Sequence, residues 1–309
     1  MLRRCLSVHR IVLSGALVLA FAPSARAVPI DQITILDIGD SGTTNDQTIF
    51  EANANPTSPS TGTGVFQPFV RVQATGSSQQ TASFTAQNGS NGNPISQSGG
   101  VVQRGFNTDA KEPSINFDTK GGKWTHSITL GDVGTVTRNG TQYLEFDLDA
   151  NEPGRADSLE NQIDITDIQI FAGPANPLAN PEAGGVGTLD SNGLLQLGSN
   201  ADLVWRLDNA TNGNVTVTLQ SSICDAPGQC GSGHGDMTLL IPRSALNLSG
   251  VSLDDQLVFY TVYDRAGGSG SGFEEWRNGT GPPIPEPRAA LAFAAGALIV
   301  GWATRRARR

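Results

Sequence analysis

Short apolar segments recur along this chain and constrain its fold more than any other feature. From about residue 115 onward they come at intervals of about ten residues, and Gly, Asn, Asp or Pro bounds each of them. This spacing is typical of a β-sandwich, and no window longer than two turns carries a helical apolar stripe outside the two ends. The 37 glycines and the 16% of charged residues also argue against a helical bundle. The sequence therefore predicts an all-β fold, an antiparallel and jelly-roll-like β-sandwich over residues 28–281. The expected strands are 124–130, 133–138, 143–148, 163–171, 203–207, 215–219, 237–241 and 257–262.

Two dipeptides predict β-hairpins within this series. Asn139-Gly140 joins two expected strands directly, and Asn212-Gly213 lies between 203–207 and 215–219. The earlier part of the domain, residues 28–110, is rich in loop-forming residues. Within it, the polar stretch 76–100 is compatible either with a mobile segment or with a weakly patterned hairpin.

The first 27 residues have the three parts of a secretory signal peptide. Three arginines precede the uncharged apolar stretch 11–22, and Ala25 and Ala27 supply the small residues of a cleavage site. The alternative is a membrane anchor that stays attached. Twelve apolar residues are too few to span about 30 Å of hydrocarbon, so we expect a signal peptidase to remove residues 1–27.

The other end of the chain also has the composition of a sorting signal. Pro285-Glu286-Pro287 precedes the apolar run 289–303, and four arginines follow that run. Residues 282–309 thereby resemble the PEP-CTERM sorting signal of bacterial exported proteins. The resemblance implies that an exosortase recognises Pro285, Glu286 and Pro287, and that the hydrophobic sorting helix holds the chain in the inner membrane only until processing. An ordinary C-terminal anchor is the alternative, which explains the apolar run and the arginines but not the Pro-Glu-Pro.

The charge of the remaining body restricts its partners. Residues 28–285 contain 11 basic and 28 acidic side chains, a net charge of −17. Such a surface repels nucleic acid and anionic lipid headgroups and attracts divalent cations. We therefore expect no nucleic-acid partner.

Two cysteines, Cys224 and Cys230, remain after the predicted signal peptide is removed. An oxidising compartment and an even count favour a disulfide between them, which would close a small turn. Zinc is the alternative, but His126 and His234 do not have metal-ligand spacing to these cysteines.

Strand alternation over residues 143–149 predicts one acidic face. Glu145, Asp147 and Asp149 share that face, and Asn151 follows them, so these oxygen ligands are a candidate Ca²⁺ site. The segment lacks the loop pattern of an EF-hand, and a solvated strand face is the alternative. Asp236 and the pair Glu274-Glu275 are weaker candidates of the same kind. No other cofactor is expected.

The middle of the chain resembles one recurrent group of PEP-CTERM proteins. The resemblance rests on several short blocks spread over residues 60–287 and strengthens the expectation of export. That group has no assigned enzymatic activity. The blocks are 65–72, 105–108, 124–127, 143–153, 231–237 and 272–276.

No catalytic motif is evident in the sequence. It contains no Gly-x-Ser-x-Gly elbow, no zinc-ligand set and no phosphate-binding loop. Glu274 and Glu275, beside Trp276, are the best available pair for a glycan hydrolase, but neighbouring strand residues point to opposite faces. Trp124, Trp205 and Trp276 are candidate platforms for stacking on a sugar ring, whereas a core or edge position is the favoured alternative for Trp276.

These observations predict an exported, exosortase-processed protein of the cell surface or extracellular matrix with a structural or adhesive, non-catalytic role. The first alternative is a carbohydrate-binding module that acts on exopolysaccharide. A secreted glycan hydrolase with an unrecognised site is the second.

Overall fold

The computed structural model describes most of the predicted body of the chain. The described residues are 32–53, 67–73, 80–87, 94–109, 117–151, 162–174, 188–190, 193–197, 201–221, 235–266 and 273–279. Across these ranges the chain forms strands, turns and 3-10 turns, with no α-helix. None of them contains a helix long and apolar enough to cross a membrane. The predicted signal peptide, the predicted sorting signal and both cysteines of the predicted disulfide lie outside the described residues.

The first of two large sheets has eight strands, and all of its pairings are antiparallel except that of β1 with β14. In spatial order its strands are β1 (Gln32–Ile35), β14 (Thr216–Gln220), β10 (Gln162–Gly173), β16 (Gln256–Ala266), β6 (Pro94–Phe106) and β5 (Gln80–Gln87), with β13 (Asp202–Arg206) beside β10 and β7 (Ile128–Thr129) beside β16.

The second large sheet has seven strands and is antiparallel throughout. Its strands are β2 (Ser41–Thr43), β3 (Ile49–Ala52), β15 (Met237–Pro242), β9 (Thr141–Ala150), β17 (Glu274–Asn278) and β4 (Val70–Val72), with β8 (Thr135–Arg138) beside β9. A small separate ribbon pairs β11 (Thr188–Leu189) with β12 (Leu195–Gln196).

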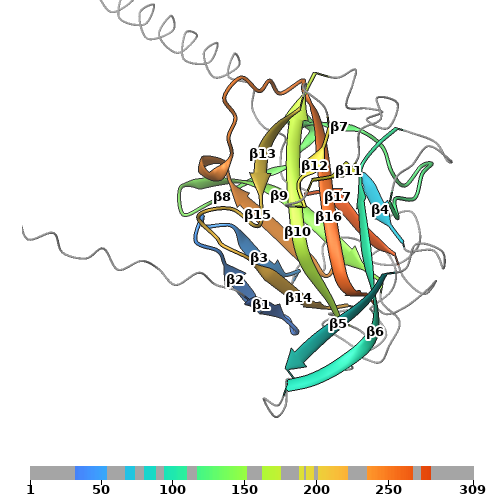
Figure 1. Cartoon of the computed structure of the whole chain (residues 1–309). Coiled ribbons are helices and arrows are strands. Elements are labelled where there is room, and N and C mark those ends of the chain that lie inside the picture. The colour runs from blue at the N-terminus through green and yellow to red at the C-terminus, as the bar shows by residue number, and fades with distance from the viewer. Residues whose placement is uncertain are drawn as a thin grey trace, which may run out of the picture.

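The two large sheets lie face to face around one hydrophobic core (Figure 1). Phe259 of the eight-stranded sheet meets Phe146 and Trp276 of the other sheet, with ring centroids 5.1 and 5.0 Å apart. Along the chain, β9, β15 and β17 belong to one sheet, whereas β10, β14 and β16 belong to the other. The chain therefore crosses repeatedly from one sheet to the other, and each crossing brings another apolar strand face into the core. The predicted all-β, sandwich-like architecture is confirmed.

A β-bulge in β10 explains how its sequence keeps one face in the core. Ile163 and Ile165 point inward, and after a register shift between Ile165 and Asp167 the inward positions become Ile168 and Ile170. The extra residue resets the two-residue alternation. All four isoleucines are thereby fully buried. Asp167 is turned to the opposite face of the sheet, where it contacts Arg206 and Gln169.

The hairpin predicted at Asn139-Gly140 is confirmed. Arg138 pairs with Thr141, and the two residues between them have positive φ values of 50° and 83°. Positive φ at both central positions is the geometry that a two-residue hairpin turn requires, and Asn and Gly tolerate it best.

The hairpin predicted at Asn212-Gly213 is wrong. Strands β13 and β14 do not pair with each other in the structure but occupy successive stretches of β10. The Asn212 side chain is buried, where it donates to the Leu207 carbonyl (3.2 Å) and accepts from the Asp46 backbone amide (2.9 Å). Gly213 does have a positive φ of 75°, so the chain turns there, but each of the two strands pairs with β10 and not with the other.

The N-terminal part of the body packs with the rest of it. Strands β1, β3, β4 and β6 are distributed over both sheets. Of the two alternatives for residues 76–100, the structure has the hairpin, formed by β5 and β6. The strand expected over 124–130 is reduced to β7 (Ile128–Thr129). Thr129 is then the N-cap of the 3-10 turn Leu130–Asp132.

Candidate functional site

The acidic face of β9 is not the solvated surface that its alternation suggested. Asp147 is only 4% exposed. Both Nε and Nη2 of Arg277 donate to its Oδ2, at 3.1 and 3.0 Å, and the Thr238 hydroxyl donates to its Oδ1 at 2.8 Å. Arg277 and Thr238 come from the strands on either side of β9, β17 and β15. The carboxylate is therefore part of a cross-strand ion pair that is buried within the molecule.

A second ion pair lies further along the same face. The Arg71 guanidinium contacts the Glu275 carboxylate, joining β4 to β17. The same guanidinium lies over the rings of Trp124 and Phe273, 4.2 and 4.1 Å from their centroids. Burial raises the pKa of Glu275, and the charge and hydrogen bond of Arg71 partly offset that rise.

The four residues of the candidate Ca²⁺ site do not form one coordination shell. Asp147 is engaged by Arg277, and the Asn151 amide donates to Asp149 Oδ1 at 3.0 Å instead of presenting an oxygen beside it. In the ranges that the structure describes, no group of three or more His, Cys, Asp or Glu residues is placed to hold a metal ion. Asp236 is also buried, and its Oδ2 accepts from the Ala150 amide at 2.8 Å.

The three tryptophans occupy different environments. Trp276 is fully buried in the core and its Nε1 donates to the Tyr263 hydroxyl, so its ring offers no face to a sugar. Trp205 is 3% exposed and donates from Nε1 to Asp46 at 2.9 Å. Trp124 is half-buried, and Lys123 lies 4.1 Å from its ring centroid in addition to Arg71. Trp124 is thus the one ring of the three with substantial exposure.

The pair Glu274-Glu275 is placed on one strand and not around an open cleft. Glu274 is fully buried and Glu275 is held by Arg71. Neighbouring positions on β17 face opposite sides of the sheet. The geometry therefore does not place Glu274 and Glu275 on either side of one bond.

Asp46 organises a polar corner that sequence reasoning missed. Its carboxylate accepts from the Thr44 hydroxyl (2.5 Å), the Thr48 amide (3.0 Å) and the Trp205 indole (2.9 Å). Burial alone would raise its pKa, but the hydrogen bonds from Thr44, Trp205 and Thr48 outweigh burial and lower the pKa. Asp46 is therefore held as a carboxylate between the segments that carry β2, β3 and β13.

A surface hollow of about 530 Å³ opens beside this corner. It lies along β13 and next to the 3-10 turn Arg243–Ala245. Polar and apolar side chains both line it, and the hydroxyls of Thr211 and Ser244 are at exposed positions. The lining residues are Asp46, Leu203, Val204, Trp205, Arg206, Asn209, Ala210, Thr211, Ser244 and Ala245.

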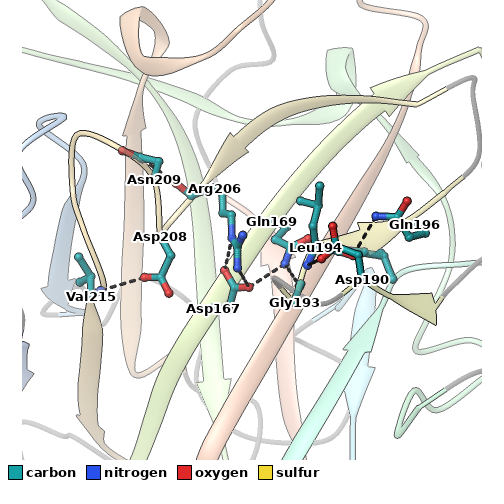
Figure 2. Close-up of polar contacts among 11 residues, drawn as sticks. Asp167, Gln169, Asp190, Gly193, Leu194, Gln196, Arg206, Asp208, Asn209 and Val215 are labelled. Carbon is teal, nitrogen blue, oxygen red and sulfur yellow. Dashed lines mark hydrogen bonds and ion pairs between the residues drawn. The ribbon is translucent and has the colours of Figure 1, made fainter.

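Arg206 connects the hollow to a buried network on the outer face of the eight-stranded sheet (Figure 2). Its Nε and Nη2 atoms donate to the two oxygens of Asp167, at 3.2 and 2.9 Å. The fully buried Gln169 side chain donates to Asp167 (2.7 Å) and to the Gly193 carbonyl (2.6 Å), and accepts from the Leu195 amide (2.8 Å). Gln169 thereby fixes the β11–β12 ribbon to the sheet.

Asp208 is a carboxyl of this region whose pKa is raised. Burial raises its pKa, and the nearby charge of Asp167 raises it further. The Val215 amide donates to its Oδ1 at 2.8 Å, which together with Arg206 opposes the rise. No sequence motif links Asp167 to Arg206 and Asp208, because Asp167 is 39 positions before Arg206 and only the pairing of β10 with β13 brings it close to them.

Neither the protein-family models nor the curated proteins compared with this chain give a match.

Proposed function

We propose that this protein is exported, processed at Pro285-Glu286-Pro287 by an exosortase, and delivered to the cell surface or extracellular matrix, where its role is structural or adhesive. The two terminal segments of the sequence and the net charge of −17 between them support this proposal. The body between them would be a jelly-roll-like sandwich, as the repeated crossing of the chain between the sheets suggests.

The proposal of a non-catalytic role rests on one observation, which is that arginines on other strands hold the buried carboxylates. Four arginines of the sheets each hold a carboxylate on another strand, so these acids stabilise strand pairing and are not available to a substrate. Buried ion pairs of this kind also oppose alternative strand registers. The three largely buried pairs are Arg71–Glu275, Arg206–Asp167 and Arg277–Asp147, and the fourth, Arg138–Glu51, is partly exposed.

The hollow beside β13 supports one second function, which is carbohydrate binding. It has the volume of a small-ligand site, and it combines hydroxyl, amide and guanidinium groups with apolar surface. A sugar unit needs that mixture of hydrogen-bonding groups and apolar contact. We prefer this site to Trp205 and Trp276 as stacking platforms, since Trp205 is 3% exposed and Trp276 is fully buried. Of the three tryptophans, Trp124 alone stays a candidate platform.

A sedimentation pull-down separates these two functions. A chain of residues 28–281 retains every described strand and is mixed with the producing organism's exopolysaccharide, with and without Ca²⁺. An unrelated neutral glucan is the control polymer. Retention on the exopolysaccharide alone supports carbohydrate binding, and Thr211→Trp, which fills the hollow, should then abolish retention while Ser249→Trp at another exposed turn should not. No retention in either condition leaves the structural role.

Intact mass spectrometry of the surface-exposed protein tests the processing. We expect a mass that lacks residues 1–27 and the segment C-terminal to the Pro-Glu-Pro. Recovery of surface protein that retains residues 289–303 would contradict exosortase processing and favour an ordinary anchor.

A further inference from the structure

The hairpin of β5 and β6 extends the eight-stranded sheet beyond its other strands. Strand β16 pairs with β6 only at positions 101–106, so positions 94–100 of β6 pair with β5 alone among the described residues. The two strands form a projecting ribbon at one end of the molecule (Figure 1), which we call the β5–β6 arm. A two-stranded ribbon is only marginally stable by itself in water.

Strand β5 is also an edge of unusual length for this protein. Among the described residues, β1, β2 and β4 also end the large sheets, and they have four, three and three residues. Strands β7, β8 and β13 likewise pair on one side only and have two, four and five residues, whereas β5 has eight. Very short edge strands and charged residues are the usual devices that prevent edge-to-edge pairing. The other edge strands are protected by their short length, and β5 is not.

Strand β5 also lacks the charged residues that protect an edge. No charged residue occurs between Arg71 and Arg104, a span that contains the whole of β5 and all of β6 up to Gln103. The rest of the body has a large excess of acidic residues. Two copies of this protein repel each other over most of their surfaces, and the arm is where they can approach without that repulsion.

We propose that the β5 edge pairs with the β5 edge of a second copy of this chain, in antiparallel orientation about a two-fold axis. Strand β5 reads Gln-Thr-Ala-Ser-Phe-Thr-Ala-Gln. In a register centred on Ser83, Ser83 stands opposite Ser83 of the other copy, Thr81 opposite Thr85 and Ala82 opposite Phe84, because a two-fold axis normal to the sheet brings together residues of the same face. This arrangement sets no charge against a like charge and is isologous, as a closed dimer requires.

The pairing converts two marginal arms into a continuous four-stranded segment that joins two eight-stranded sheets. The outward N–H and C=O groups of each β5 then gain main-chain partners. A second copy fits this edge better than an unrelated acidic or basic partner, because the arm has no charge with which to attract one. This inference concerns the β5 edge and does not depend on the proposed function.

Sedimentation velocity of residues 28–281 over the micromolar range tests the proposal. We expect a concentration-dependent dimer that tightens as salt is added, because salt screens the repulsion between the acidic bodies. The variant Ser83→Asp/Thr85→Asp should weaken the dimer by about tenfold or more, since four carboxylates would then meet at one interface. The control Thr137→Asp/Ser249→Asp adds the same charge at exposed positions away from the arm and should dimerise like the wild type.

Hydrogen exchange on the wild-type chain gives a readout that needs no variant. The amides of residues 80–87 should become more protected as the protein concentration rises. A chain that stays monomeric throughout the range, or a dimer that forms without added protection at 80–87, overturns the proposal. So does a dimer that Ser83→Asp/Thr85→Asp leaves at full strength.

Discussion

Arg277 directs two of its nitrogens at a single oxygen of Asp147, and the two residues are 130 positions apart in the chain. The pair joins β17 to β9, and both of its side chains are buried. It explains one of the three carboxylates of the acidic pattern of β9, since Asp147 is a partner for arginine.

Removing the arginine should leave an uncompensated buried charge. We expect Arg277→Met to reduce the free energy of unfolding by about 3 kcal/mol, within the range found when one partner of a buried pair is removed. Arg138→Met is the matched control, because its pair with Glu51 is partly exposed and should contribute about 1 kcal/mol or less. Urea unfolding of both variants makes the comparison, and equal losses would contradict the assigned role of burial.

Gln169 should be essential for holding the β11–β12 ribbon. Gln169→Leu removes its bonds to Asp167, Gly193 and Leu195 and leaves buried polar groups without this partner. A loss of about 2 kcal/mol or more is expected from such groups. Hydrogen exchange should accelerate at residues 193–197, and unchanged exchange there would show that the apolar contacts of the ribbon suffice.

Two carboxyls should respond to pH in opposite directions. The folded-state pKa of Asp208 is raised above its ordinary value of 3.8, so its contribution to stability is present below that value and is lost as pH rises through the folded pKa. We therefore expect Asp208→Asn to be more stable than wild type at neutral pH, and this gain should vanish once the pH falls below 3.8.

The folded-state pKa of Asp46 is lowered instead, so its contribution is present above 3.8 and is lost as pH falls through the folded pKa. Asp46→Asn should accordingly be less stable than wild type at neutral pH and approach it in acid. Thermal unfolding of both variants across this range is the measurement. A stability difference that does not change with pH would show that the effect is steric.

The turn between β8 and β9 allows a test of backbone conformation. Gly140 has a φ of 83°, and a Cβ built there meets no atom within 4 Å. Gly140→Ala should therefore cost about 1 kcal/mol through backbone strain alone. Chemical denaturation measures this cost, and Thr137→Ala, an exposed position on the same hairpin, should cost less.

Much of the strand content could be predicted from local patterns. The alternation over residues 143–149 and the apolar run 163–171 gave strands because a two-residue period presents one continuous apolar face. Asn139-Gly140 gave a hairpin because few dipeptides tolerate two positive φ values. The bulge at Asp167 could not be predicted, since the register of β10 depends on the strand beside it.

The candidate sites were harder to predict than the strands. Trp276 and Trp205 were both candidate sugar platforms, although a core or edge position was already favoured for Trp276, and only the positions of Tyr263 and Asp46 showed that both rings are buried. Asp147 carried a carboxylate suitable for calcium, and only the register of β17 against β9 placed a guanidinium beside it. The Asp167–Arg206–Gln169 network has no sequence signal at all.

The sequence by itself determined that this chain forms short strands, that two of its residues turn one hairpin, and that its body is strongly acidic. Those properties depend on neighbouring residues or on composition, and no distant contact is needed to produce them. Only the tertiary structure decided which strands pair, which carboxylates are buried against arginines, and which edge remains long and uncharged. The physical reason is that burial and pairing depend on strands up to about two hundred positions apart, such as β1 and β14 or β3 and β15.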